Sequence, residues 1–198
     1  MDRMIYLSMS GAKASMQRQD VLANNLANVS TNGFRAELAA FRAVPVQGSG
    51  ASTRVYSLES TVGSSFEPGA VTPTGRPLDV AMKGNAWLAV QGLDGTVNAR
   101  DAQGRSNRIG RLKLVSPESP ATLQRGPDGL FRAAEGDLGA DATARLQDGA
   151  LEGSNVNPIS AMVDMIAVAR QFEVQMRMLQ NAERNDQTAS QLLSLTGG

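Results

Sequence analysis

The feature that decides the fold is the C-terminal stretch NPISAMVDMIAVARQFEVQMRMLQNAERNDQTASQLL, residues 157–193. Asn157 can accept hydrogen bonds from the first backbone N–H groups of a helix. Pro158 suits the first helical position, because an N–H group is not needed there. The stretch therefore predicts one helix over residues 158–193, about 54 Å long at about 1.5 Å per residue.

Apolar residues repeat along this helix at alternating steps of three and four, the spacing of a seam that faces a partner helix. Before Ala169 they also cover most of the cylinder, so several neighbours must bury this end at once. Arg170, Arg177 and Arg184 recur every seven residues on another face. The members of the seam are Met162, Met165, Ala169, Phe172, Met176 and Leu179.

The first thirty residues or so predict a second helix with a weaker seam. Its members are small, flexible or polar, so they specify packing geometry loosely. The segment leads to Asn32 and Gly33, which predict a helix stop and a turn. The members of this seam are Ile5, Met9, Ala12, Met16, Gln19, Ala23 and Leu26.

Periodicity alone leaves two arrangements of these helices open. They could form a hairpin within the chain, packed on the middle domain. They could instead pack between copies of the protein, or between the protein and its relatives. We expect the second arrangement, because a domain of this size cannot cover a rod of about 54 Å along its whole length. Both terminal segments would then be largely disordered before assembly.

The residues between the helices predict a β-rich, Gly-rich middle domain, and the fold class is α+β. Residues 78–82 and 86–90 alternate on either side of a Gly-Asn turn and predict a hairpin. Residues 94–108 are polar and predict a loop. Further strands are expected at residues 53–57, 109–115, 130–132 and 144–146. The expected domains are an N-terminal rod helix and turn (1–40), the middle domain (41–153) and a C-terminal rod helix (154–198).

Composition excludes several classes of function. Basic and acidic residues both total 19, so the net charge is zero and no basic patch points to nucleic acid. The chain has no Cys, which excludes disulfides, thiolate metal sites and Cys nucleophiles. It has no His, the commonest general base and metal ligand. The apolar runs are too short for a secretory signal peptide or a membrane span. We expect a cytosolic protein, or one exported without a cleaved signal.

Four carboxylates of the middle region could suggest a wall-cutting hydrolase, because paired acids hydrolyse glycosides. They are Glu67, Asp79, Asp94 and Asp101. Isolated acids in Gly-rich turns are usually solvated, and we expect Asp79 to cap a turn or to face solvent. The sequence therefore predicts no catalytic residue, no cofactor, no metal site and no small-molecule substrate. A β-rich binding module with helical arms stays open as another alternative.

Three ordered stretches carry a resemblance to a known family. Residues 22–34, LANNLANVSTNGF, resemble the N-terminal signature of the flagellar rod and hook axial proteins. Residues 74–80, TGRPLDV, resemble the shared internal motif of that family, and residues 151–158, LEGSNVNP, resemble the start of its C-terminal helix. Within the family, the proximal rod proteins of the basal body look most similar, on residues 1–6, 40–45 and 170–176. A distal rod or hook-type protein is the alternative.

The resemblance implies a structural subunit, not an enzyme, with terminal helices that form a coiled-coil-like rod domain. It implies export through the flagellar type III apparatus without a cleaved signal, and a place in the periplasmic rod. The implied neighbours are the distal rod protein FlgG, the proximal rod proteins and possible further copies of the chain. Relatives usually carry dozens more residues of β structure after residue 95, so the middle domain is apparently shortened near residues 95–108.

The resemblance and the two seams together give the residues that we expect at assembly interfaces. They are Ile5, Met9, Met16, Asn24, Asn25, Leu26, Asn28, Met162, Met165, Ile166, Ala169, Phe172, Met176 and Leu179.

Overall fold

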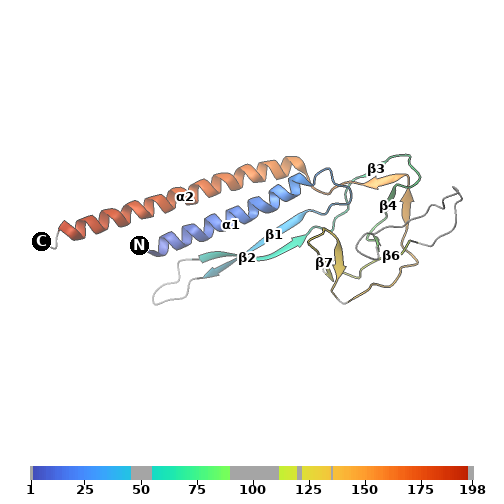
Figure 1. The fold of residues 1–198 in the computed structure, drawn as a ribbon, viewed down its shortest axis with the longest axis horizontal. Helices are drawn as coiled ribbons and strands as arrows, with labels where there is room; N and C mark the ends of the chain where they lie inside the picture. Colours follow the sequence, from blue (N-terminus) through green and yellow to red (C-terminus); the bar gives the residue numbers. More distant parts are fainter. Residues whose placement is uncertain (1, 46–54, 90–111, 120–121, 135, 196–198) are drawn as a thin grey trace. The chain divides into compact units, whose positions relative to one another are not determined.

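The computed structural model describes residues 2–45, 55–89, 112–119, 122–134 and 136–195 (Figure 1). The fold is α+β, as predicted. In the sequence, helix α1 (Asp2–Ala27) precedes all the strands and helix α2 (Pro158–Leu195) follows them. The chain forms two compact units, a helical unit of residues 1–67 and 154–198 and a strand unit of residues 68–153. Residues 41–67, which we expected to begin the middle domain, group with the helices.

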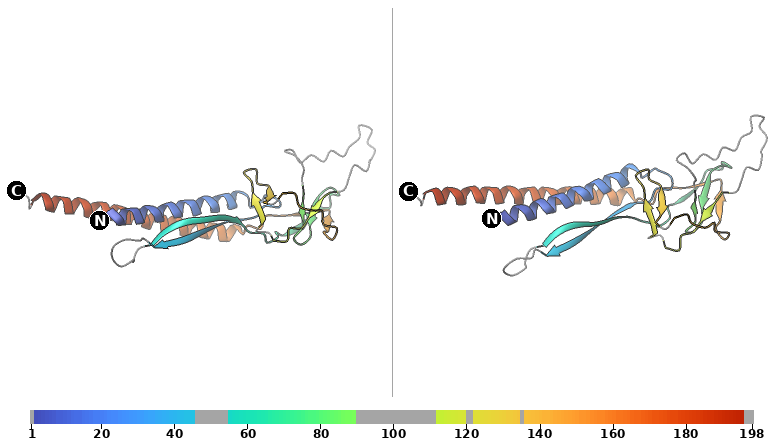
Figure 2. Two further views of the ribbon diagram at one scale, coloured as in Figure 1. Left: turned by 90° about the horizontal axis from the view of Figure 1, so that it is seen from below. Right: turned by 60° about the horizontal axis from the view of Figure 1, so that its bottom comes forward.

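The helical unit consists of the two helices and a two-stranded ribbon. Strands β1 (Glu37–Pro45) and β2 (Val55–Ser64) pair antiparallel, with one irregularity between Ala40 and Phe41. Helix α1 packs against α2 on one side and against both strands of the ribbon on another, so it lies between α2 and the ribbon (Figures 1 and 2). The two helices run antiparallel, because both chain ends lie at the same end of the pair (Figure 1).

The ends of the helices follow the local chemistry of the sequence. The Asn157 side chain accepts hydrogen bonds from the backbone N–H groups of Ile159 (3.0 Å) and Ser160 (3.1 Å), which confirms the predicted cap of α2. Helix α1 ends at Ala27, earlier than the predicted stop at Gly33. The side-chain amide and the backbone N–H of Asn28 both donate to the Asn24 carbonyl, and from Val29 on the backbone bonds span three residues, as in a turn. Gly33, with a φ of 69°, belongs to the turn that follows.

The structure shows the hairpin alternative for the terminal helices, and their packing between copies stays a prediction. The helices pack against each other within one chain, as a hairpin beside the ribbon. Their contact also uses a different face from the predicted seams. The buried residues are Ser8 and Ser15 on α1, and Ala161, Val168 and Ala182 on α2. On α2, Ala161 and Val168 are buried where the predicted seam has Met162 and Ala169, whereas the predicted seam residues Met165, Phe172 and Leu179 are half-buried.

The strand unit is built from four short antiparallel pairs. The pairs are β3 (Val71–Pro73) with β10 (Ala150–Glu152), β4 (Val80–Met82) with β9 (Leu146–Asp148), β5 (Trp87–Leu88) with β6 (Leu114–Val115), and β7 (Leu123–Arg125) with β8 (Phe131–Ala133).

The predicted hairpin of residues 78–82 and 86–90 is wrong. A turn does lie at Gly84, with a φ of 68°, but β4 and β5 take separate partners that are distant in the sequence. Residues 53–54 and 90–111, with the predicted loop and part of three predicted strands, lie outside the described residues.

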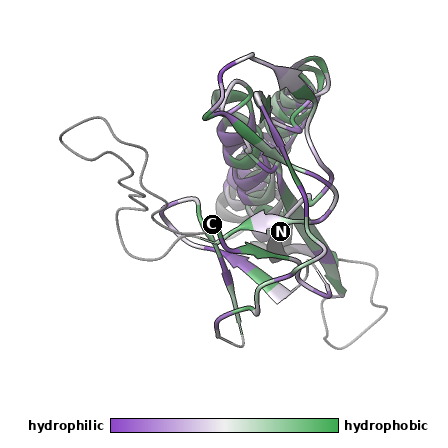
Figure 3. Ribbon diagram, turned by 90° about the vertical axis from the view of Figure 1, so that its right-hand side faces the viewer, coloured by the Kyte–Doolittle hydropathy of each residue, from purple (hydrophilic) through white to green (hydrophobic). Residues whose placement is uncertain are grey.

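The buried apolar residues of the strand unit are mostly small. They are Ala81, Ala86, Val115 and Ala150. The rings of Trp87 and Phe131 meet edge to face, with centroids 5.2 Å apart, and the guanidinium of Arg125 lies 5.6 Å from the Phe131 centroid. Hydrophobic and hydrophilic residues alternate along the helices and strands (Figure 3).

Candidate assembly interface

The inner face of the helix pair is lined by small residues. A Cβ atom added at Gly11 would lie 2.8 Å from Cδ of Gln175, so the glycine lets the Gln175 amide lie directly against the α1 backbone. One turn later the Ser15 hydroxyl is buried and donates to the Gly11 carbonyl at 3.0 Å. Small residues on the α1 face toward α2 allow the two helices to approach closely. The large side chains lie on the other faces of the pair.

The outer faces of the pair expose many of its large apolar side chains. On α1 these include Met9 and Met16, which are 54% and 55% exposed. On α2 they include Met162 at 52% and Ile166 at 56%. These four residues, all expected at an assembly interface, are open to a partner in the described structure.

The other expected interface residues lie closer to the intrachain contact. Asn25 is buried, and Asn24 is exposed. The remaining ones are half-buried: Ile5, Leu26, Asn28, Met165, Ala169, Phe172, Met176 and Leu179. Sequence reasoning missed Ser8, Gly11, Ser15 and Gln175. A second, small-residue stripe on α1 was the available signal, but apolar periodicity ranks Met above Gly and Ser.

Asn25, from the first family-like stretch, joins α1 to the ribbon. Its side-chain oxygen accepts from the backbone N–H of Glu37 at 2.7 Å, and its amide donates to the Glu37 carbonyl at 2.9 Å. The buried amide thus satisfies both backbone groups of the first residue of β1. The next part of the same stretch ends at Phe34, which is also buried.

Asn155, from the third family-like stretch, joins three segments of the helical unit. Its oxygen accepts from the Ala36 N–H at 2.6 Å, and its amide donates to the carbonyls of Ser65 (3.2 Å) and Glu67 (2.8 Å). Its own N–H donates to the Phe34 carbonyl at 3.2 Å. Two residues before the cap of α2, one side chain therefore fixes where that helix begins relative to the end of the ribbon at which β1 starts and β2 finishes.

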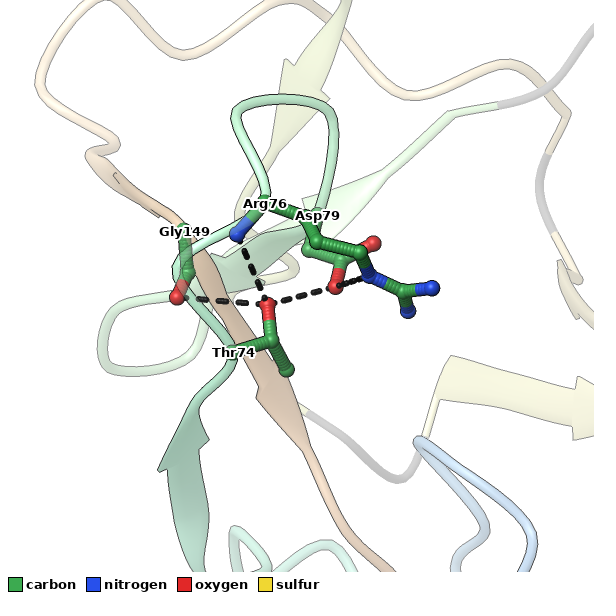
Figure 4. A network of polar contacts seen from close by, with 4 residues as sticks. All are labelled: Thr74, Arg76, Asp79 and Gly149. Carbon is green, nitrogen blue, oxygen red and sulfur yellow. Dashed lines mark hydrogen bonds and ion pairs between the residues drawn. The ribbon is translucent and has the colours of Figure 1, made fainter.

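The internal family-like stretch forms a braced turn in the strand unit (Figure 4). The Thr74 hydroxyl and the Arg76 Nε both donate to the same oxygen of Asp79, at 2.5 and 2.8 Å. The backbone N–H of Thr74 donates to the Gly149 carbonyl at 2.7 Å, and the Gly149 N–H donates to the Asp79 carbonyl at 2.8 Å. The hydrogen bonds from Thr74 and Arg76 lower the pKa of Asp79 below its ordinary value.

Three described carboxylates of the strand unit, those of Asp79, Asp128 and Asp141, are engaged in local contacts, whereas the candidates Asp94 and Asp101 lie outside the described residues. Asp79 braces the turn just described. Asp128 pairs with Arg132 at 2.5 Å, and this contact lowers the pKa of Asp128 to about 2. Hydrogen bonding to Ser116, followed by Thr143, lowers the pKa of Asp141 to about 2. Among the described residues there is no group of three or more acidic side chains that could hold a metal ion.

Comparison with known proteins matches both ends of the chain to flagellar families. The family described as "Flagella basal body rod protein" matches residues 5–35. The family described as "Flagellar basal body rod FlgEFG protein C-terminal" matches residues 147–192. These ranges contain most of α1 with its following turn, and the start and most of α2.

Similar proteins cover nearly the whole chain. The flagellar basal-body rod protein FlgF of Salmonella typhimurium (strain LT2) is 38% identical over 252 aligned positions, which cover 99% of this chain and 100% of that protein. FlgF of Escherichia coli (strain K12) gives the same identity and coverage. FlgG of Bacillus subtilis (strain 168), another basal-body rod protein, is 23% identical over 91% of this chain and 95% of its own length.

The length of these alignments bears on the middle of the chain. The alignment with Salmonella FlgF has 252 positions and this chain has 198 residues, so at least 54 positions have no residue of this chain opposite them. Both ends are nonetheless matched, as the two family ranges show. The chain is thus homologous to FlgF but lacks an internal part of it.

None of the described helices is long and apolar enough to cross a bilayer. The joints at Asn25 and Asn155, the braced turn at Asp79 and the paired terminal helices coincide with the stretches that resemble the rod and hook axial proteins. With two matching family ranges and relatives 38% identical over their full length, the chain belongs to the flagellar basal-body rod protein family and is homologous to the proximal rod protein FlgF.

Proposed function

We propose that the chain is a structural subunit of the proximal rod and assembles with other rod subunits through the outer faces of α1 and α2. The observation that carries this proposal is the distribution of side-chain size on the helix pair. Small residues such as Ser8 and Ser15 are buried inside the chain, whereas large ones such as Met16 and Ile166 are exposed.

The physical reason is the cost of leaving apolar area in water. Burial of apolar surface stabilises by about 25 cal/mol per Å², and exposed patches of large apolar residues mark contacts with other molecules. The first two turns of α2 expose Ile159, Met162, Val163 and Ile166 together. Because Ile159, Val163 and Ile166 recur at steps of four and three on one face of the helix, a neighbour that packs on this face would bury these three at once.

The expected neighbours and location follow from the family. FlgF and FlgG are both named as basal-body rod proteins, so we propose other rod subunits, including FlgG, and further copies of this chain as partners. We also propose that the chain reaches a periplasmic rod through the flagellar type III export apparatus, without a cleaved signal. A structural family with carboxylates engaged in turns argues against an enzymatic role.

The test is electron microscopy of isolated basal bodies from cells whose copy of this chain carries a small epitope. Antibody label is expected on the rod, and cells without the chain should lack complete rods and should not swim. Unlabelled rods from motile cells that express the tagged chain, with the chain recovered elsewhere, would refute the proposed function.

A further inference from the structure

The outer surface of the helix pair has two distinct apolar parts. The first is an open side, on which α1 contributes Met9 and Met16 and α2 contributes Met162, Ala169 and Met176. The second is an outer ridge, the face of α2 opposite α1, with Ile159, Val163, Ile166 and Val174. The ridge side chains are 74%, 60%, 56% and 51% exposed, in that order.

Helical geometry places both halves of the open side next to each other. At about 100° per residue, Met9 and Met16 lie about a quarter turn from the α1 line that faces α2. Met162, Ala169 and Met176 lie about a quarter turn from the α2 line that faces α1. Because the helices are antiparallel, these quarter turns lead to the same side of the pair. The ribbon packs on α1 from another direction, which leaves this side uncovered (Figure 2).

The side chains of the outer ridge are rigid and those of the open side are flexible, so the open side can adapt its shape to the ridge. Ridge residues are β-branched Ile and Val, which hold one strongly preferred rotamer in a helix. The open side is lined mainly by Met, whose flexible side chain adapts to an incoming shape. The repeat of the open side, with Met9 and Met16 seven residues apart, is the spacing that receives another helix.

Charge is complementary as well. The ridge carries Arg170, Arg177 and Arg184, of which Arg177 meets Glu173 at 3.7 Å. Among the described side chains, and apart from Glu173, which pairs with Arg177, the open side and its border carry the exposed acids Asp20 and Glu183 against one exposed base, Lys13. A positive ridge and a net negative open side would attract each other and would disfavour ridge-to-ridge contact.

We propose that the outer ridge of one copy packs into the open side of a second copy of this chain. The inference rests on the proposed rod function and names the partner of its helical faces. Because the two surfaces are different patches of the same molecule, the contact is heterologous and propagates from copy to copy. Contacts of this type build rings or helical arrays and not closed two-fold dimers.

The test uses the absence of Cys from the chain, since every thiol is then an introduced one. One epitope-tagged copy carries Met16→Cys, and a second copy with a different tag carries Ile159→Cys, Val163→Cys, Ile166→Cys or Val174→Cys. Both copies are expressed together, basal bodies are isolated, and a short bismaleimide is added. The matched control replaces Met16→Cys by Arg18→Cys, an exposed α1 position away from the open side.

We expect a mixed cross-linked product with at least one ridge position, and at least tenfold less with Arg18→Cys. Reversing the ridge charges by Arg170→Glu and Arg177→Glu should lower the yield of the mixed product severalfold. Products only between identical positions would overturn the proposal, and so would no product from basal bodies that contain both copies. Absence of the unmodified chain from basal bodies would instead refute the proposed rod function.

Discussion

The helical unit and the strand unit hold their parts together by different means. In the helical unit, single side chains join segments far apart in the sequence, as Asn155 does for Ala36 and Ser65. In the strand unit, short strands are closed by turns in which glycines such as Gly75 and Gly149 adopt positive φ. The helical unit therefore depends on a few irreplaceable contacts, whereas the stability of the strand unit is spread over many small ones.

Among the substitutions that test this difference between the units, Asn155→Ala is expected to have the largest effect on stability. The change removes three side-chain hydrogen bonds and leaves the Ala36 N–H and two carbonyls without these partners, so it should lower the unfolding free energy of the helical unit by about 2–3 kcal/mol. Urea unfolding followed by helical circular dichroism measures it. The control is Asn181→Ala, at an exposed position of α2, which should cost less than about 0.5 kcal/mol. Equal costs for the two variants would contradict the role of Asn155 as a joint.

Phe172→Ala tests whether the helices pack within the chain. A fully buried Phe→Ala costs about 3–5 kcal/mol, and because Phe172 is half-buried we expect about 2 kcal/mol in the isolated monomer. Val174→Ala, two residues away on the outer ridge, should change monomer stability little. Thermal unfolding of dilute monomer compares them. An unchanged melting temperature for Phe172→Ala would favour the original expectation of termini that are disordered before assembly.

The sequence predicted both helices and the cap at Asn157 because these depend on local spacing and local hydrogen bonds. It placed Met162 and Ala169 in the α2 seam where Ala161 and Val168 are buried, because apolar periodicity cannot distinguish a face that packs within the chain from one that packs outside it. The seam on α1 is instructive in the same way, since its Met9 and Met16 are exposed and the actual contact uses Ser8, Gly11 and Ser15.

The strand pairing was less predictable. The turn at Gly84 is local and was found, but β4 pairs with β9, which lies more than sixty residues along the chain. Tertiary contacts decide which short strands pair. A strand of two or three residues is too short for its sequence pattern to specify its partner. The joints at Asn25 and Asn155 were located only as family-like stretches, since nothing in an isolated Asn indicates which backbone group it binds.

A smaller effect is expected from the cap of α2. Asn157→Ala should cost about 1 kcal/mol, because the N–H groups of Ile159 and Ser160 lose their acceptor. Asn157→Asp keeps an acceptor and should retain most of this stability. Amide exchange of the first turn of α2 should rise in the Ala variant only. Equal protection in both variants would show that the joint at Asn155 alone fixes this helix end.

The smallest effect is expected on the stability of the strand unit at acidic pH. The folded state lowers the pKa of Asp141 to about 2, from an ordinary value near 3.9. Its carboxylate therefore adds stability above about pH 4, and this contribution is lost as the pH falls toward 2. The single Trp, Trp87, lies in the strand unit, so its fluorescence follows that unit. Asp141→Asn should reduce the dependence of this transition on pH between about 4 and 2, and an unchanged dependence would show that other groups cause it.

The central claim is that the inner face of the helix pair holds the chain together and the outer faces hold the rod together. Met16→Glu tests it most directly, with monomer unfolding and incorporation into basal bodies measured on the same variant. Because Met16 is 55% exposed in the chain, we expect the unfolding free energy to change by less than about 0.5 kcal/mol. Incorporation should be lost, because a charge would be placed in a contact that excludes water. Normal incorporation of Met16→Glu, or its failure only through an unfolded monomer, would contradict the claim.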